Sequence, residues 1–518
     1  MRFLHGLIGP RSIRLVALVC GIVLLCTIYL FANPSVSDDF WLFYRPLADE
    51  NPDINLVKSL FRYTTKHPIH PPYQQTYGNV GRRSGLLRQW LNLARKSDDS
   101  AAKDLLNDMA EKLAASTFPF LKERLNQHPS SQLQRPLADL QASFEPDSTG
   151  IVIPTSDKSV RSAARLLLNL RSVLGSTLPV QIAYAGDHDL AAENRELLSR
   201  IDFPGPPIEF LDINTVFNPY VTQFEQGSWE IKPFAALASR FERVLIADPD
   251  VGFFQLPDTF LQDEAITHTG AWMSKDRLFW YHAYRDPTDW DRYIEPDVDR
   301  YTLPGKVVDQ ALFIVDAGLA FFDKGRLDIL LGLLCVCWQH SYDVRKELTH
   351  PLRYGSRAVW WRGLEMAGAR YVEPDHYGGV IGEGAHDRDG VKVCGSALVH
   401  VDPKGRLLWW KGDLSTDQGK GPRKWMIEGT SPGPFSARWE EIRAGSLSDE
   451  ELDIVGRTMD IDVEPYHRWL DTDTIIADAA GRNRPNDAAD EAGSLAHLRA
   501  KGRGKLTPEK HNVYTSLR

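Results

Sequence analysis

Short apolar runs alternate with periodic, helix-like stretches between residues 150 and 250. The apolar runs predict strands, and the stretches between them, whose apolar residues recur every three or four positions, predict helices. The predicted strands are Gly150–Pro154, Val180–Ala185, Ile208–Leu211 and Val244–Ala247, and the predicted helices are Ser159–Leu174, Leu190–Ile201 and Ile231–Phe241. This alternation indicates an α/β fold built on βαβ units with a mostly parallel sheet. Ligands of such sheets bind beyond the carboxyl ends of the strands, so the loops after these strands are the first candidates for a site.

The segments on either side of this region have different patterns. Apolar residues recur at helical spacing from Arg82 to about Phe144, which predicts two or three helices packed on the sheet domain. Residues 33–80 are interrupted by prolines and are interpreted as a stem. After Gly412 the strand–helix alternation is lost, and from Ala477 the chain has few large apolar residues, which is typical of disorder.

One uncharged apolar run, Leu15–Ala32, is long enough to cross a membrane. Its 18 residues match a bilayer core of ~30 Å. Arginines precede the run and aspartates follow it, which predicts a cytosolic N-terminus and a luminal remainder. A cleaved signal peptide is the alternative, but the run ends in Tyr29-Leu30-Phe31 rather than in small residues. The predicted organisation is a cytosolic tail (1–14), a transmembrane signal-anchor (15–32), a stem and helical region (33–147), a catalytic domain (148–415) and a C-terminal extension (416–518).

The net charge and the number of cysteines indicate which partners this protein binds and whether it can form disulfides. Lys and Arg number 60 against 69 Asp and Glu, a net charge of −9 without a dense basic stripe. This balance argues against nucleic acid as a partner. Beyond the apolar run only Cys335, Cys337 and Cys394 remain. An oxidising lumen permits one disulfide among them, and buried free thiols are the open alternative.

The sequence Asp248-Pro-Asp250 directly follows the predicted strand Val244–Ala247. Two carboxylates at the end of a buried strand can face one cleft, and such oxygen ligands suit Mg²⁺ or Mn²⁺. A metal there can stabilise the charge on a departing diphosphate. The pattern Asp-x-Asp occurs seven times in the chain, and only the copy at Asp248 follows a strongly apolar strand of the βαβ region. A solvated turn is the alternative interpretation.

His400 lies near the end of an alternating segment, Gly395–Asp402. A histidine added to two carboxylates makes a mixed nitrogen and oxygen site suited to Mn²⁺. A packed structural histidine is the alternative.

Several motifs occur in order over residues 148–415 and together resemble the fungal α-1,3-mannosyltransferase family of Golgi type II membrane enzymes. The motifs are Gly150–Pro154, Leu178–Asp187, Trp229–Phe234, Arg243–Asp250, Asp316–Gly318, Asp323–Arg326, Trp360–Gly368, Leu398–Asp402 and Leu408–Gly412.

The resemblance implies a GT-A-like, Rossmann-type nucleotide-sugar fold with a mixed sheet. It further implies GDP-mannose as donor, Mn²⁺ as cofactor, retention of configuration and a mannose-terminated glycan of a glycoprotein as acceptor. A place in a Golgi enzyme complex is part of the same expectation. By position, Asp248 and Asp250 would be the metal motif and His400 the third metal ligand.

Further residues take expected roles from the same resemblance. Lys232 would contact the donor diphosphate, and Asp248 would share in donor binding. Pro154 and Thr155 would lie under the base or ribose. Gly318 would border the sugar pocket together with Asp316. Ordinary loop or surface roles remain open for these positions.

Catalytic assignment is less direct, and Asp316 and Glu365 are the two candidate nucleophiles. The segment Gly355–Ala358 departs from the family's acidic pattern, with Ser356 and Ala358 in place of acidic residues. This departure leaves three alternatives open: α-1,2 linkage, another donor sugar, or a catalytically weak paralogue that binds glycans or acts as a scaffold.

Overall fold

The computed structural model describes residues 53–121, 135–201, 204–277, 315–352 and 359–459, except 373, 375, 388–389, 403, 413–424, 431–442 and 447. The predicted membrane anchor, the segment Gly355–Ala358 and residues 460–518 lie outside these ranges. Within them, no helix has both the length and the apolar character needed to cross a membrane.

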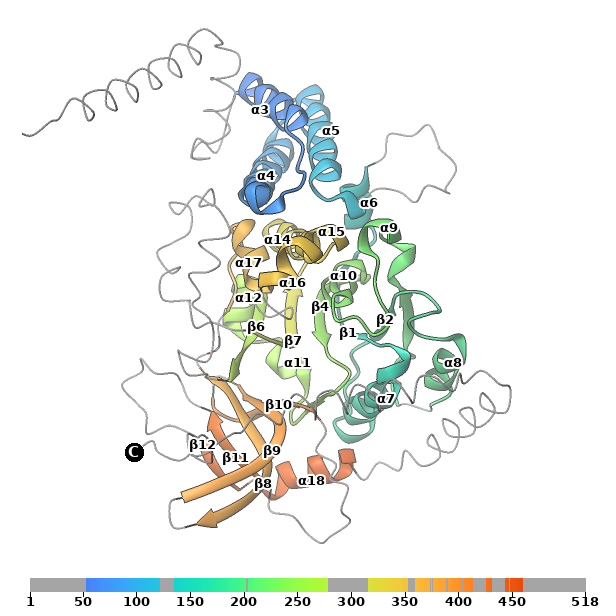
Figure 1. Cartoon of the computed structure of the whole chain (residues 1–518), viewed down its shortest axis with the longest axis vertical. Helices are drawn as coiled ribbons and strands as arrows, with labels where there is room; N and C mark the ends of the chain where they lie inside the picture. The colour runs from blue at the N-terminus through green and yellow to red at the C-terminus, as the bar shows by residue number, and fades with distance from the viewer. Residues whose placement is uncertain are drawn as a thin grey trace, which may run out of the picture. The chain divides into compact units, whose positions relative to one another are not determined.

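A parallel half-sheet begins the α/β region, as the apolar runs predict (Figure 1). Its strands lie in the order β3-β2-β1-β4, and every neighbouring pair is parallel. The strands are β1 (Glu145–Pro154), β2 (Val180–Tyr184), β3 (Glu209–Asp212) and β4 (Phe241–Ala247). The predicted helices are confirmed as α7 (Val160–Leu168), α8 (Ala192–Arg200) and α10 (Ile231–Ala238).

The second half of the sheet is mainly antiparallel, which corrects the expectation of a mostly parallel sheet and confirms a mixed one. It continues from β4 in the order β7-β6-β8-β9-β10-β5, with β11 beside β8 and β12 beside β11. Its strands are β5 (Val251–Phe253), β6 (Ala271–Arg277), β7 (Val315–Asp323), β8 (Tyr377–Asp387), β9 (Gly390–Val401), β10 (Leu407–Lys411), β11 (Trp425–Thr430) and β12 (Arg443–Ser446). The sheet therefore extends beyond residue 415.

A layer of helices covers one face of the central strands. Helix α10 packs on β1 and β4, whereas α14 (Leu327–Gln339) and α17 (Val359–Met366) pack on β7. The rings of Phe322 and Trp360 stack with centroids 5.2 Å apart. The strand residues that face this layer alternate with buried residues of the opposite face, as expected for a sheet covered on both sides. The remaining helices are α9 (Pro219–Thr222), α11 (Pro257–Phe260), α12 (Glu264–Thr269), α15 (Tyr342–Val344), α16 (His350–Leu352) and α18 (Asp449–Met459).

The N-terminal helices pack on this helical layer rather than standing apart from it. They are α3 (Ile54–Lys66), α4 (Tyr73–Lys96), α5 (Ser100–Thr117) and α6 (Pro136–Ala142). Tyr77 donates to Gln339 Oε1 (2.6 Å), and Ser84 Oγ lies 3.0 Å from Cys335 Sγ. The predicted helices are thus confirmed. Within residues 33–80, interpreted as a stem, the structure describes α3 and the start of α4, and the prolines of 68–72 separate the two helices.

Two of the cysteines are resolved as buried free thiols, Cys335 and Cys337. Both lie on α14, which is buried along nearly its whole length, and burial raises the pKa of the Cys335 thiol to about 12. The side chain of Cys394 lies outside the described residues. Of the two alternatives that the sequence leaves open, the structure has free thiols at 335 and 337.

Candidate active site

The Asp248–Asp250 loop is held between strands that are distant in sequence. The backbone N–H of Asp248 donates to the carbonyl of Gly318 on β7 (2.8 Å). The N–H of Gly412, just after β10, donates to the carbonyl of Asp250 (3.0 Å). Strand β5 then pairs with β10, so that Lys411 lies opposite Val251. These contacts bring the ends of β4, β7 and β10 together.

The carboxylate of Asp248 lies between two lysine ammonium groups. Lys411 Nζ donates to Asp248 Oδ2 (2.6 Å), and Lys232 Nζ contacts Oδ1 as an ion pair. Asp248 is buried, with 5% of its surface exposed. Its Oδ1 accepts no well-directed hydrogen bond, so the contact with Lys232 is ionic rather than directional. Lys232 comes from the first turn of α10, and Lys411 from the end of β10.

Asp250 is the second carboxylate of this loop. Burial raises its pKa, and the negative charge of Asp248 adds to the increase, while Lys411 and Lys232 act in the opposite direction. Asp250 also lines a cavity of about 50 Å³ beside Ser162, Trp410 and Thr458. That volume suits ordered water and is far below the space that a nucleotide-sugar needs.

Asp316 and His400 form a buried pair next to Lys411. His400 Nε2 donates to Asp316 Oδ2 (2.9 Å), and Lys411 Nζ lies 3.8 Å from Asp316 Oδ1. The His400 ring stacks on Trp409 with centroids 4.1 Å apart. Burial alone would raise the pKa of Asp316, but the hydrogen bond and charge of His400, together with the charge of Lys411, hold it below its usual value. Both carboxylate oxygens of Asp316 thus have hydrogen-bond partners, His400 at Oδ2 and the N–H of Gly318 at Oδ1.

Gly318 is required by close packing. A Cβ at this position would lie 2.9 Å from Lys411 Cδ and 3.1 Å from Asp316 Oδ1. Its N–H also donates to Asp316 Oδ1 (2.9 Å). The missing side chain at Gly318 thus leaves the space through which Lys411 reaches the carboxylates of Asp248 and Asp316.

The other predicted residues lie at different places. Pro154 ends β1, and the N–H of buried Thr155 donates to the carbonyl of Ala183 (2.8 Å), so both lie at the carboxyl edge of the sheet. Glu365 belongs to α17, where it accepts a hydrogen bond from Tyr371 (3.2 Å). Its charge acts on Tyr77 of α4, so Glu365 lies in the helical layer. The structure brings Asp316 to Asp248 through Lys411, which contacts both carboxylates.

Several tryptophans between residues 270 and 410 are buried in the core. Among them are Trp272, Trp360, Trp361, Trp409 and Trp410, each with 8% exposure or less. Trp280 and Trp290 lie outside the described residues.

The loop fits a divalent cation in its chemistry, although the predicted three ligands are not gathered. Asp248 and Asp250 are close enough to repel each other, and a buried oxygen of Asp248 lacks a directed partner. Hard oxygen ligands of this kind suit Mn²⁺ or Mg²⁺. Within the described ranges, however, no three His, Cys, Asp or Glu side chains form a group able to hold a metal. His400 is engaged with Asp316 instead of joining Asp248 and Asp250.

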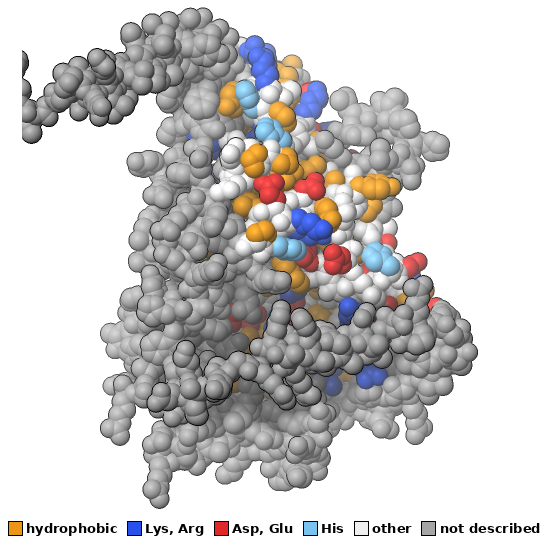
Figure 2. Space-filling view, in the orientation of Figure 1, with side chains coloured by type: hydrophobic (Ala, Val, Ile, Leu, Met, Phe, Trp, Pro, Cys, Tyr) orange, Lys and Arg blue, Asp and Glu red, His pale blue; other side chains and the backbone are white. Residues whose placement is uncertain are grey.

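Lys411 is the site residue that sequence reasoning did not single out. It belongs to the motif Leu408–Gly412, but its position in that motif does not indicate a partner. Only the pairing of β10 with β5 and β9 places it beside Asp248. On the face seen in Figure 1, charged and histidine side chains lie close together between apolar ones (Figure 2).

A sheet that gathers acidic and basic side chains at the carboxyl ends of its strands is typical of α/β proteins whose ligand sites lie at that edge. Comparison with known proteins gives the family. Residues 148–402 match the family model described as "Mannosyltransferase putative". The match covers just under half of the chain and supports the fungal mannosyltransferase family of glycosyltransferases for this region.

Individual relatives are about 25% identical to this chain over the aligned segments. The "Putative alpha-1,3-mannosyltransferase MNN15" of Candida albicans is 25% identical over 51% of this chain and 41% of its own length. The "Alpha-1,3-mannosyltransferase MNT3" of Saccharomyces cerevisiae is 25% identical over 66% of this chain and 59% of its own. The chain thus spans about half the length of these relatives. Among solved structures, the S. cerevisiae mannosyltransferase Ktr4p in complex with GDP matches 63% of this chain and 84% of its own, at 10% identity and a TM-score of 0.25.

Proposed function

We propose that this protein transfers mannose from GDP-mannose to a mannose-terminated glycan of a glycoprotein, with Mn²⁺ as cofactor. The observation that carries the proposal is the buried carboxylate of Asp248 between Lys232 and Lys411 at the ends of β4 and β10. The family membership and the names of the relatives support mannose as the transferred sugar and an α-1,3 linkage. A GT-A-like donor fold, a luminal site and a Golgi membrane anchor at residues 15–32 are part of the same proposal.

The side chains present can perform the parts of this reaction that involve charge. Asp248 and Asp250 would hold the metal, which supplies Lewis-acid stabilisation of a leaving diphosphate when bound. Lys232 and Lys411 can approach the diphosphate as compact, flexible cations. In the transfer, the bond between the mannose anomeric carbon and the phosphate oxygen breaks and a bond to the acceptor oxygen forms. The acceptor hydroxyl gives its proton to the departing diphosphate oxygen. Because Asp316 is buried and held by His400, retention is better explained by acceptor attack from the leaving-group face than by a covalent intermediate on Asp316.

A GDP-release assay tests this function directly. The full-length protein with Mn²⁺ and GDP-mannose is expected to release GDP faster when α-mannobiose is added. Asp248→Asn should reduce this acceptor-dependent rate by about a hundredfold or more, because the metal and lysine arrangement supplies several kcal/mol of charge stabilisation. The matched control is Asp187→Asn, which changes another Asp-x-Asp at an exposed side chain paired with Arg195 (2.8 Å). The control should retain the wild-type rate.

Other results would redirect or refute the proposal. Equal rates for Asp248→Asn and Asp187→Asn would remove the Asp248 site from the reaction. Binding of GDP-mannose without turnover would favour a glycan-binding or scaffolding paralogue. Release from a different nucleotide-sugar alone would exclude GDP-mannose as donor, and analysis of the disaccharide linkage in the product would decide between α-1,3 and α-1,2.

A further inference from the structure

Two lysines of this chain are the cations that contact Asp248. Lys411 contacts Oδ2 and Lys232 contacts Oδ1, so the two ammonium groups lie against both oxygens of the carboxylate. A divalent metal at Asp248 needs at least one of these oxygens. Metal and lysine therefore compete for the same carboxylate, because adjacent cations repel each other strongly in a partly buried site.

The contacts of Lys411 differ in strength between its two acidic neighbours. Its ammonium is 2.6 Å from Asp248 Oδ2 but 3.8 Å from Asp316 Oδ1. Asp316 is held independently by His400 and by the N–H of Gly318. Asp316 can therefore stay in place when the ion pair between Lys411 and Asp248 breaks. Its negative charge then still attracts the Lys411 ammonium.

The two lysines are also placed to move. The Lys411 side chain is 26% exposed and that of Lys232 11%. The glycine at 318 leaves room for the Lys411 stem, since a Cβ there would lie 2.9 Å from Lys411 Cδ. Lys232 makes an ion pair without a directed hydrogen bond and reaches the carbonyl of Ala317 only at 3.4 Å. Neither ammonium is fixed by the planar double hydrogen bond that an arginine would make.

We propose that Lys232 and Lys411 are exchangeable partners of Asp248, which move to the donor diphosphate as a divalent metal takes their place. Lys411 is then a diphosphate-binding residue, and metal and nucleotide each improve the binding of the other. This inference rests on the proposed function, because it takes a nucleoside diphosphate as the ligand. The diphosphate draws the lysine ammonium groups away from Asp248, where they compete with the metal. The metal in turn frees the lysines from Asp248 to bind the diphosphate, which couples the two binding steps.

Binding of Mn²⁺ to the full-length protein, followed by electron paramagnetic resonance with and without GDP, tests the exchange. In wild type, GDP should tighten Mn²⁺ binding by about tenfold or more. Without GDP, Lys411→Met should bind Mn²⁺ about tenfold more tightly than wild type, because the competing ammonium is gone. With Mn²⁺ present, the same variant should bind GDP about tenfold more weakly.

Two further variants keep the test decisive. Lys232→Met removes the other ammonium from a different element, so it should shift Mn²⁺ binding in the same direction even if Lys411→Met does not fold. Lys404→Met is the matched control, since Lys404 is an exposed lysine in the turn between β9 and β10. It should leave Mn²⁺ and GDP binding at their wild-type values.

The outcomes separate this inference from the proposed function. Unchanged Mn²⁺ affinity in both Lys411→Met and Lys232→Met, with GDP bound normally, overturns the exchange and leaves the donor assignment intact. Failure of GDP to bind the wild-type protein overturns the donor assignment itself. Tighter Mn²⁺ binding together with weaker GDP binding, in either lysine variant but not in Lys404→Met, supports the exchange.

Discussion

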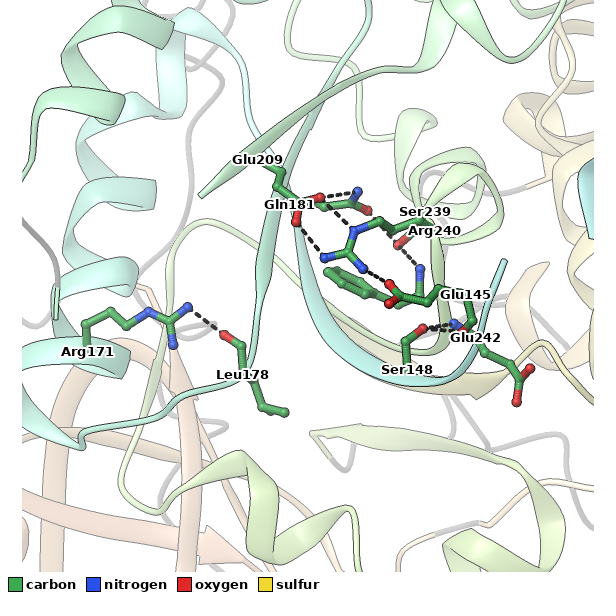
Figure 3. A network of polar contacts seen from close by, with 10 residues as sticks. Glu145, Ser148, Arg171, Leu178, Gln181, Glu209, Ser239, Arg240 and Glu242 are labelled. Carbon is green, nitrogen blue, oxygen red and sulfur yellow. Dashed lines mark hydrogen bonds and ion pairs between the residues drawn. The ribbon is translucent and has the colours of Figure 1, made fainter. Parts of the chain in front are cut away.

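Helix α10 and strand β4 carry ion pairs at both ends, and the two ends are built differently. At one end, Lys232 of α10 contacts Asp248 just beyond β4. At the other, Arg240 lies between the two elements and contacts Glu209 and Glu145 (Figure 3). We call the first the site end and the second the base end.

At the base end each polar group has a directed and redundant partner. Arg240 makes two hydrogen bonds to Glu209, through Nε (2.9 Å) and Nη2 (2.6 Å). Gln181 donates to Glu209 (3.0 Å) and accepts from Ser239 (2.7 Å). The paired hydrogen bonds of an arginine fix geometry as well as charge. This network therefore fastens β1, β2 and β3 to the start of β4.

At the site end the cations are lysines, and one carboxylate oxygen lacks a directed hydrogen bond. The comparison shows that similar numbers of charges can serve different purposes. Forked arginine pairs hold the sheet in one arrangement, whereas lysine pairs with Asp248 can be replaced by a metal and a phosphate. The predictions below test whether the base end is structural and the site end functional.

The largest expected effect on stability comes from Lys324, a buried lysine at the base end. Its Nζ donates to the carbonyls of Ser239 (2.6 Å) and Leu237 (3.2 Å), where α10 ends, and lies 3.9 Å from the centre of the Phe144 ring. Lys324→Ala leaves both carbonyls unpaired and a void beside Phe144. We expect the free energy of unfolding in urea to fall by about 3 kcal/mol.

The control for Lys324 is a lysine of the helix surface. Lys112, with 55% of its side chain exposed, pairs with Asp108 within α5. Lys112→Ala should cost about 0.5 kcal/mol or less. Equal losses in the two variants would show that Lys324 does not hold the end of α10.

A smaller effect, and one that depends on pH, is expected from the His400–Asp316 pair. His400→Phe keeps a ring on Trp409 but removes the contacts that lower the pKa of Asp316. A carboxyl group with a lowered folded-state pKa adds stability above its unfolded pKa and loses it as the pH falls. The variant should therefore be less stable than wild type by about 2 kcal/mol at pH 7. The difference should shrink below about pH 4, near the ordinary pKa of aspartate.

Thermal unfolding from pH 7 to pH 3 measures this dependence. Introducing His400→Phe into an Asp316→Asn background should remove the shrinking difference, since no carboxyl group remains to titrate at 316. A difference that stays constant with pH would mean that His400 acts by packing alone.

The smallest effect is expected from Arg240→Lys at the base end. A lysine keeps the charge but loses the paired hydrogen bonds to Glu209. Because Arg240 is 35% exposed on its side chain, the loss should be about 1 kcal/mol or less in urea unfolding. Acceptor-dependent GDP release should stay at the wild-type rate. A marked fall in that rate, with the fold intact, would contradict a purely structural role for the base end.

The sequence by itself determined the parts of this protein that depend on local pattern. The runs at Gly150–Pro154 and Val244–Ala247 became β1 and β4 because each is a continuous apolar segment of strand length. The same reasoning placed Asp248 at the end of a buried strand. Helix α10 followed from its apolar periodicity, with Lys232 in its first turn.

Tertiary structure alone decided which side chains contact each other at the site. Lys411 meets Asp248 across 163 positions of sequence, and His400 meets Asp316 across 84. Such pairs depend on the antiparallel order of β7, β9, β10 and β5, which no local pattern encodes. His400 therefore pairs with Asp316 rather than with the Asp248–Asp250 loop, because strand register, and not residue type, sets the distance between side chains.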